Sequence, residues 1–280
     1  MKTITVITTM YKGKKYLDNL LSNINTNRLN IQSIYHDIDV EYIIVNDDPT
    51  DKLEDISNVK VINNSENYGI HKSRAIAVKL AKGDYIQFLD QDDYLADDAL
   101  LKQYENIKDN DVSLANGYEQ YVGYKEPIYS SLKKHNQALE MKWYTSIGCM
   151  IISPGQCLIR KNSIPKKWLE HYLDYNCSDD YLLWLMMLEG NKKFVVNDYY
   201  AFYHNNTGEN ISGSFETCYR SNLKCCELAR KYSLLSQKTI YNLERMSKMK
   251  LDWKIIHRNK MVLIFQYLDI FIKNLLYKVL

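Results

Sequence analysis

The sequence has little proline and glycine, with 4 and 10 of its 280 residues. It contains no uninterrupted apolar run of about 18 residues, so we expect no membrane-spanning helix. The N-terminal stretch is too short and too rich in threonine for a signal peptide. The six cysteines lack C-x-x-C spacing, which argues against zinc or a disulfide framework and favours a reduced, cytosolic setting. A net charge of +2 provides no global field for nucleic acid.

Residues 1–100 alternate between strand and helix patterns. Strands are predicted where short β-branched or apolar runs occur, and helices where apolar residues recur every three or four positions. The predicted strands are 3–9, 41–45, 59–62 and 85–89, and the predicted helices are 16–24 and 70–81. Gly83 is expected to end the second helix. This order predicts an α/β domain with a mostly parallel central sheet flanked by helices.

Beyond residue 100 the patterns are less regular. The predicted helices are 95–107, 165–173 and 179–188, and strand-like pieces lie at 112–122, 156–159, 193–196 and 199–203. Polar, irregular stretches at 127–146 and 205–213 are expected to be loops. From about residue 215 the chain is expected to be helical.

Three carboxylates, Asp90, Asp92 and Asp93, follow the strand at 85–89. Their mutual repulsion is costly unless a cation or a solvated cleft offsets it. Mg²⁺ usually binds through one or two carboxylates plus substrate phosphates, so the pattern favours a metal–diphosphate site. The alternative is an acidic turn that caps the following helix.

The polar segments 8–11, 46–51 and 90–93 all follow predicted strands. In open α/β sheets, ligands bind outside the carboxyl ends of the strands. We therefore expect these three segments to converge on one edge of the sheet.

The ordered motifs resemble those of family 2 glycosyltransferases with the GT-A fold. V-I-T-T-M-Y is similar to their first strand, and I-I-V-N-D-D-P-T-D resembles their V-D-D-G-S-T-D block. N-Y-G-I-H-K-S-R-A followed by G-D-Y-I-Q-F-L-D-Q-D-D resembles N-x-G-x-x-x-A-R-N through G-x-Y-I-x-F-L-D-x-D-D. S-D-D-Y-L-L-W-L resembles the helix start that carries the family's catalytic base. The likeness is strong over 1–100, moderate over 150–213, and absent from the tail.

The resemblance implies a nucleotide-sugar donor, most simply a UDP-sugar, bound with Mn²⁺ or Mg²⁺. Asp92 would be the direct metal ligand, and Asp90 would contact the ribose or the water shell of the metal. Asp47 would accept the N3–H of a uridine, flanked by Thr9 and Tyr11. Plainer alternatives stay open: an Asx-turn at Asp47, and a strand end and core aromatic for Thr9 and Tyr11.

Two further charged residues have open alternatives. Arg74 lies on a helix that begins near the site, and it could face the diphosphate or be a solvated helix charge. Asp93 is expected to cap the helix that follows.

Asp180 is the candidate general base, since it matches the family's catalytic carboxylate. One base and one displacement imply inversion at the anomeric carbon. Asp179 replaces the family's usual Glu, and both residues would also suit N-capping. His204 falls where relatives have a Tyr-Arg-x-His segment, and it could be a metal ligand, a phosphate contact or the counterpart of the Arg.

The resemblance divides the chain into a GT-A domain of residues 1–213 and a helical extension of 214–280. The domain would have a nucleotide-binding half, 1–100, and an acceptor-binding half, 101–213. The tail beyond residue 248 is apolar and basic. It could lie on a membrane interface, pack on its own domain, or pair with another subunit in a homo-oligomer.

The sequence thus predicts a metal-dependent, inverting glycosyltransferase that transfers one sugar to a glycan or lipid-linked acceptor. We expect it in a bacterial polysaccharide or lipopolysaccharide pathway, in the cytoplasm or at the inner face of the cell membrane. Q-x-x-R-W and several spanning helices, which mark the processive relatives, are missing. The rivals are a nucleotidyltransferase and a non-catalytic nucleotide-sugar or glycan-binding module. A nucleotidyltransferase would have a Gly- and Lys-rich phosphate loop near the N-terminus, which residues 11–15 match poorly.

Overall fold

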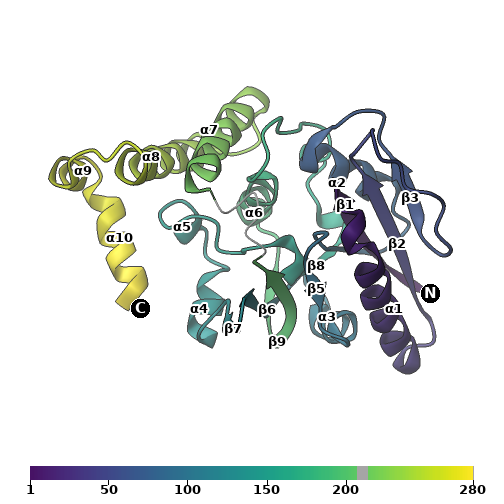
Figure 1. Ribbon diagram of the computed structural model, residues 1–280. Coiled ribbons are helices and arrows are strands. Elements are labelled where there is room, and N and C mark those ends of the chain that lie inside the picture. The colour runs from purple at the N-terminus through teal and green to yellow at the C-terminus, as the bar shows by residue number, and fades with distance from the viewer. Residues whose placement is uncertain (207–213, 280) are drawn as a thin grey trace.

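The computed structural model describes residues 1–206 and 214–279 (Figure 1). Its sheet has nine strands in the order β3-β2-β1-β4-β8-β6-β9-β5, with β7 paired to β6. The strands are β1 (Lys2–Met10), β2 (Ile38–Asn46), β3 (Lys60–Asn63), β4 (Tyr85–Phe88), β5 (Tyr94–Leu95), β6 (Val112–Tyr121), β7 (Tyr124–Pro127), β8 (Cys157–Arg160) and β9 (Phe194–Asn205). The α-helices are α1 (Leu17–Ile34), α2 (Gly69–Leu80), α3 (Ala99–Ile107), α4 (Leu132–Gln137), α5 (Met141–Tyr144), α6 (Asp179–Glu189), α7 (Phe215–Tyr232), α8 (Gln237–Lys254), α9 (Lys260–Gln266) and α10 (Leu268–Val279). Short 3-10 turns lie at Lys14–Tyr16, Pro154–Gln156 and Lys161–Ser163.

The N-terminal half of the sheet is parallel, from β3 through β2 and β1 to β4. Beyond β4, the pairs β4–β8 and β8–β6 are antiparallel, and β6–β9 is parallel with two register shifts. Parallel strands are covered on both faces and therefore read as continuous apolar runs. Ile43, Ile44 and Val45 of β2 show this, because all three are fully buried.

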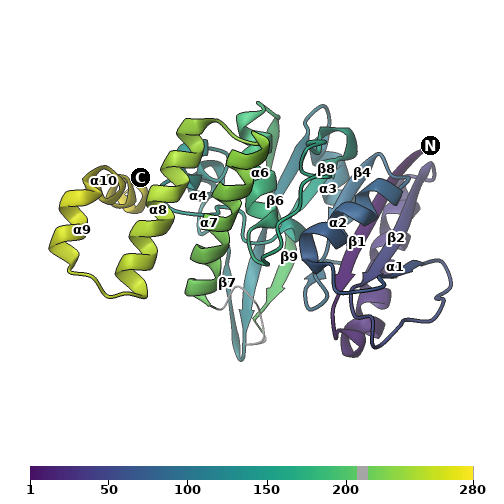
Figure 2. The same cartoon turned by 90° about the horizontal axis from the view of Figure 1, so that it is seen from above.

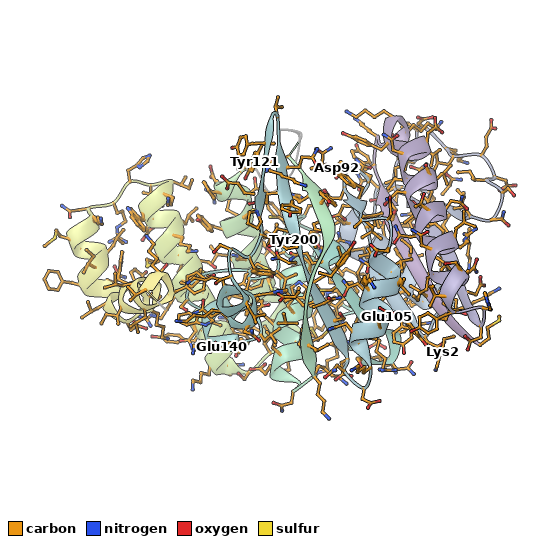
Figure 3. The ribbon with its side chains drawn as sticks, turned by 90° about the horizontal axis from the view of Figure 1, so that it is seen from below. Lys2, Asp92, Glu105, Tyr121, Glu140 and Tyr200 are labelled. Carbon is orange, nitrogen blue, oxygen red and sulfur yellow. The ribbon has the colours of Figure 1, made fainter. Side chains whose placement is uncertain are left out.

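Helices cover both faces of the sheet, which gives two cores. Leu20 and Ile24 of α1 join Leu100 of α3 in one core, while Ala75 of α2 and Trp184 of α6 belong to the other. Figure 2 shows α2, α6 and α7 on the near face, and Figure 3, from the opposite side, shows α1 and α3. On β6 and β9, tyrosine rings stack across the strands, as for Tyr118 and Tyr200 at 4.6 Å between ring centroids.

Several predictions of local structure were wrong. The predicted loop 127–146 contains α4 and α5, which bury Trp143. The predicted helix 165–173 is a series of turns, because Trp168 makes tertiary hydrogen bonds: its Nε1 donates to the Asp179 carbonyl, and its own carbonyl pairs with the ring of His71. The pieces at 193–196 and 199–203 form the single strand β9, and the helix predicted from residue 95 begins only at Ala99.

Gly83 does not cap α2. The helix ends at Leu80, and Ala81 is already extended. Gly83 is required instead for close approach to β1, since a Cβ there would lie 2.4 Å from Thr5 Oγ1. The glycine therefore sets the entry of the chain into β4.

Helices continue from Phe215 to Val279, as the sequence predicts. Cys225 of α7 and Leu243 of α8 are fully buried in the same core as α6, so these helices pack on the sheet domain. In Figures 1 and 2, α9 and α10 lie at the end of the molecule opposite β2. Among the described residues, no helix has the length and apolarity needed to cross a membrane.

Candidate active site

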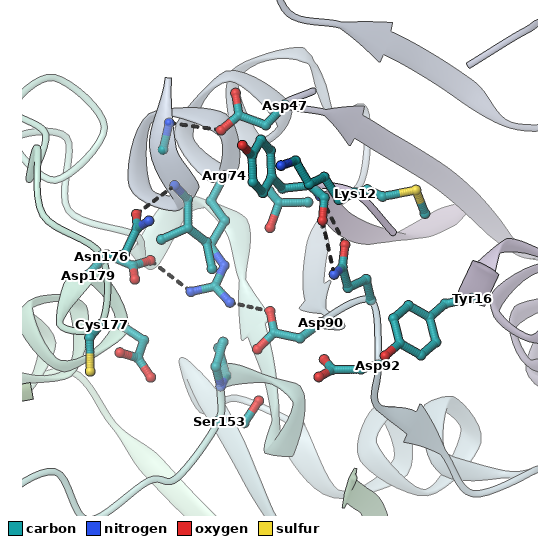
Figure 4. Close-up of a pocket in the computed structure, with 18 of the residues that line it drawn as sticks. Lys12, Tyr16, Asp47, Arg74, Asp90, Asp92, Ser153, Asn176, Cys177 and Asp179 are labelled. Atoms are coloured by element: carbon teal, nitrogen blue, oxygen red, sulfur yellow. Dashed lines mark hydrogen bonds and ion pairs between the residues drawn. The ribbon is translucent and has the colours of Figure 1, made fainter. Parts of the chain in front are cut away.

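A cavity of about 510 Å³ lies at the carboxyl ends of β1, β2 and β4 (Figure 4). The predicted convergence of the three strand-end segments is confirmed, because Thr9, Asp47 and Asp90 all line this cavity. The other candidates line it too: Tyr11, Arg74, Asp92, Asp180 and His204. The structure thus brings all eight together, and their individual roles remain predictions.

Asp47 holds the N-terminus of α2. Its Oδ1 accepts from the peptide of Tyr68 at 2.8 Å and from Asn64 Nδ2 at 2.7 Å, and its Oδ2 accepts from the peptide of Gly69 at 2.8 Å. A carboxylate at this position satisfies orphan N–H groups and complements the helix dipole. The Asx-turn of this loop lies one residue on, where Asp48 Oδ1 accepts from the Thr50 peptide at 3.0 Å.

Arg74 is a buried bridge between the two sides of the cavity. It is 3% exposed, so the solvated alternative is wrong. Its guanidinium donates to Asp179 Oδ2 at 2.7 Å and also to Asp90 Oδ1 (Figure 4). Burial alone would lower the pKa of Arg74, but the charges of Asp179 and Asp90 raise it above its ordinary value. Arg74 therefore links the loop after β4 to the start of α6.

The two carboxylates that begin α6 have different surroundings. Asp179 is buried against Arg74, whereas Asp180 is half-buried and lines the cavity. Asp180 Oδ1 accepts from the peptide of Tyr181 at 2.7 Å, so it satisfies one N–H of the first helical turn. Burial, followed by the neighbouring Asp179 charge, raises the pKa of Asp180 to about 8, and Arg74 opposes that rise. A carboxylate with such a pKa can act as a base near neutral pH.

The loop after β4 is tied to β1 and β9. The Gln91 side chain makes two hydrogen bonds to the backbone of Tyr11. Its Oε1 accepts from the Tyr11 N–H at 2.9 Å, and its Nε2 donates to the Tyr11 carbonyl at 3.3 Å. Asp93 does not cap a helix, since α3 begins only at Ala99. It is buried, and its Oδ1 accepts from the peptide of Asn205 at 2.9 Å.

His204 lies in the cavity wall with Nδ1 3.1 Å from Asp93 Oδ1. Burial lowers the pKa of His204, but the hydrogen bond and charge of Asp93 outweigh it and raise that pKa to about 9. A carboxylate that orients a histidine is typical of metal sites, while the imidazolium form suits a phosphate. The three predicted roles of His204, as a metal ligand, a phosphate contact or the counterpart of the Arg, therefore stay predictions.

The donor set can be tested against a divalent cation. Within the described residues, no three His, Cys, Asp or Glu side chains are grouped to hold a metal ion by themselves. Asp92 and His204 nevertheless reach the same cavity. Mg²⁺ needs only one or two carboxylates when substrate phosphates supply further oxygens, so these residues fit an ion shared with a diphosphate.

Several cavity residues were missed from the sequence. Lys12 has a left-handed φ of 52° after β1, and Asn176 accepts from the Ile70 peptide at 3.3 Å, a second contact at the start of α2. Both residues line the cavity with Ser153. Nothing in the local sequence around Asn176 points to α2, because the contact joins positions 106 residues apart. Most of the predicted loop 205–213 lies outside the described residues.

The chain was compared with known proteins. Residues 5–167 match the model of glycosyl transferase family 2. An uncharacterised glycosyltransferase of Haemophilus influenzae is 33% identical over 42% of this chain, and the match spans only 47% of that relative. The UDP-Glc:alpha-D-GlcNAc-diphosphoundecaprenol beta-1,3-glucosyltransferase WfaP of Escherichia coli is 30% identical over 65% of this chain and 72% of its own length.

The fold is also similar to that of a solved structure. S. aureus TarS 1–349, in a complex with UDP-GlcNAc, superposes with a TM-score of 0.61 over 91% of this chain and 73% of that chain, at 20% identity. The predicted GT-A fold is thereby confirmed. Because the family model covers more than half of the sequence, the chain belongs to glycosyl transferase family 2.

Proposed function

We propose that the chain transfers one sugar from a UDP-sugar to a glycan or lipid-linked acceptor, with inversion at the anomeric carbon. The observation that carries the proposal is that Asp180, a carboxylate with a raised pKa, shares one cavity with Asp47, Asp90 and Asp92. One cavity would thus hold both the donor and the base. Family membership favours this function over nucleotidyl transfer.

The proposed reaction is a single displacement. Asp180 takes the proton of an acceptor hydroxyl while that oxygen forms a bond to the anomeric carbon. The bond from the anomeric carbon to the diphosphate oxygen breaks on the opposite face, and its electron pair leaves with the diphosphate. Asp47 accepts the N3–H of the uracil, and Thr9 and Tyr11 flank the base.

The leaving diphosphate gains negative charge, which must be stabilised. Asp92, with His204 beside it, would hold a Mn²⁺ or Mg²⁺ ion that supplies this electrostatic stabilisation. Asp90 would contact the ribose or the water shell of the ion. Arg74 is already engaged by Asp90 and Asp179, so its part is to position these carboxylates rather than to bind the diphosphate alone.

The relatives support the substrate classes. WfaP is named for a UDP-Glc donor and a diphosphoundecaprenol-linked acceptor, and TarS was solved with UDP-GlcNAc. By analogy, we place this chain in a bacterial polysaccharide pathway, in the cytoplasm at the inner face of the cell membrane. The identity of the transferred sugar is left to the experiment.

The test is calorimetric titration with UDP, GDP and UDP-sugars, with and without Mn²⁺, for the wild type and for Asp180→Asn. We expect UDP to bind more tightly than GDP, and binding to strengthen with Mn²⁺. Asp180→Asn should keep donor affinity and lose about 10²–10⁴-fold in transfer rate to a lipid-linked acceptor.

The matched control is Asp198→Asn, an exposed carboxylate outside the cavity, which should keep full activity. If no nucleotide binds, the donor-site assignment is wrong. If donor binds but the wild type transfers nothing to any acceptor, the binding-module alternative stands. If transfer survives in Asp180→Asn, another group is the base.

A further inference from the structure

The C-terminal helices α9 and α10 are apolar on two sides. The inner side packs on the domain, where Leu263 and Ile270 are at most 2% exposed. On the same side, the ring of Tyr277 contacts Trp143 at 5.2 Å between centroids. These contacts fix which side of the two helices faces away from the protein.

The outer side is also apolar, and it is exposed. Six side chains recur there at steps of three and four residues, so within each helix they share one face. They are Met261, Phe265, Leu268, Ile272, Leu275 and Val279, with exposed fractions from 49% to 80%. Elsewhere in the described chain, large exposed apolar side chains are scattered, and such single residues are normal. A concentrated patch of this kind marks an interaction surface.

The charge around this surface is positive. Lys254, Lys260 and Lys278 are exposed, and none of them forms an ion pair with another described residue. The acidic residue within α10, Asp269, is already neutralised by Arg245 at 2.8 Å. Lys260 and Lys278 directly precede the exposed Met261 and Val279 in sequence, so this apolar side carries cations that no described acidic residue offsets.

We propose that the outer side of α9 and α10 docks onto an anionic lipid bilayer, with the helices lying in the interfacial plane. Apolar side chains entering the acyl boundary and lysines contacting anionic headgroups are the features that such a surface requires. The charged residues Asp269 and Lys273 within α10 would be costly in the bilayer core, which favours an orientation along the surface.

A second copy of the chain fits this surface less well. A two-fold contact places the same patch on both subunits, so the lysines of one copy would face those of the other. An anionic headgroup layer offers the opposite charge. Charge complementarity thus selects lipid, and self-association becomes an outcome of the test.

The docking surface is built from residues outside the cavity, so its test is independent of the proposed function. The 280-residue protein is sedimented with sucrose-loaded vesicles of phosphatidylcholine alone or mixed with phosphatidylglycerol. We expect binding to the mixed vesicles, weakening as salt is raised. The double variant F265S/L275S should bind about tenfold or more weakly, since two exposed anchors are lost. UDP titration of the same variant should be unchanged.

The matched control is L29S/I34S, which removes two apolar side chains of α1, each 59% exposed and far from α9 and α10 (Figure 1), and should bind like the wild type. Light scattering measures the molar mass in parallel. Failure to bind mixed vesicles, or equal binding to both vesicle types at any salt, would overturn the proposal. A dimer that dissociates in F265S/L275S without vesicle binding would show that the occupant is a second copy.

Discussion

The cavity joins two regions that use carboxylates differently. On the donor side, Asp47 accepts two hydrogen bonds from peptides at the start of α2 and one from the Asn64 side chain, and Asp93 ties the loop after β4 to β9. At the start of α6, Asp179 is likewise bound, to Arg74. Asp180 differs: within the described residues it has one hydrogen bond, from the adjacent peptide, and a pKa of about 8.

This difference separates carboxylates that organise the site from one that is available for proton transfer. A carboxylate whose oxygens are already engaged by several donors is less free to take a proton from a substrate. Burial raises the pKa of Asp93 to about 7, but its oxygens are engaged in this way by His204 and the Asn205 peptide. A carboxylate that is desolvated beside a like charge is a better base. The donor side is thus ordered by its hydrogen bonds, and the side of α6 retains a reactive group.

The substitution Arg74→Met tests the link between the two regions most directly, because Arg74 connects them. The substitution leaves Asp90 and the buried Asp179 without their shared counter-charge, so we expect a loss of about 3–5 kcal/mol in the free energy of unfolding. Urea unfolding at neutral pH measures it. Arg220→Met is the control, since Arg220 pairs with Glu216 on an exposed helix face and should cost at most about 0.5 kcal/mol. Equal, small losses would mean that the bridge contributes nothing.

The sequence predicts the donor side of the cavity better than the contacts that join the two regions. Parallel strands and the polar residues that follow them are local patterns, so the eight candidates could be placed on one edge from residue order alone. The bridge by Arg74 could not be predicted, because it joins residues 105 positions apart and nothing on α2 distinguishes a buried arginine from a solvated one.

Tertiary contacts account for the other errors. Residues 165–173 have the composition of a helix, but hydrogen bonds of Trp168 to α6 and His71 hold them as turns. Asp93 resembles a helix cap in sequence, yet its partner is the peptide of Asn205, from a strand far along the chain. Propensity is a weak guide wherever such contacts decide the backbone.

The pH dependence of the transfer rate tests the role of Asp180 as the base. The base form of Asp180 is populated only as the pH approaches about 8, so the transfer rate should rise about tenfold per pH unit below that value. Single-turnover rates from pH 5 to 9 would show this, with donor affinity across the same range as the control. A flat rate profile would mean that Asp180 is not the titrating base.

The same shift predicts an effect on stability. The pKa of Asp180 is raised from 3.8, so its stabilising contribution is complete below 3.8 and is lost as the pH rises through about 8. Asp180→Asn has no titrating carboxyl at this position, so it does not lose this stability as the pH rises. The difference in melting temperature, variant minus wild type, should therefore be larger at pH 8 than below pH 3.8, and thermal unfolding at both pH values measures it.

On the ordered side, Asp47→Asn should weaken the start of α2. The amide keeps one acceptor oxygen but loses the charge and presents N–H groups to the peptide of Gly69, so we expect a loss of about 1–2 kcal/mol in the free energy of unfolding. Asp84→Asn is the control, because Asp84 accepts from the Thr3 peptide at 3.0 Å away from any helix start. A loss no larger than that of the control would contradict the capping role.

The smallest effect is expected at the link between the loop after β4 and β1. Gln91→Ala removes both hydrogen bonds to the Tyr11 peptide, one at 2.9 Å and one at 3.3 Å, in an exposed position. Stability should change by less than about 0.5 kcal/mol, since water replaces these bonds. UDP affinity should fall about three- to fivefold, because Tyr11 is then free to leave the cavity wall. Calorimetry measures the UDP affinity of this variant and of the control Gln32→Ala. Gln32 donates to the Ile38 carbonyl at 3.2 Å outside the cavity, so its substitution should leave UDP affinity unchanged. If Gln91→Ala also leaves it unchanged, Tyr11 does not contribute to the base site.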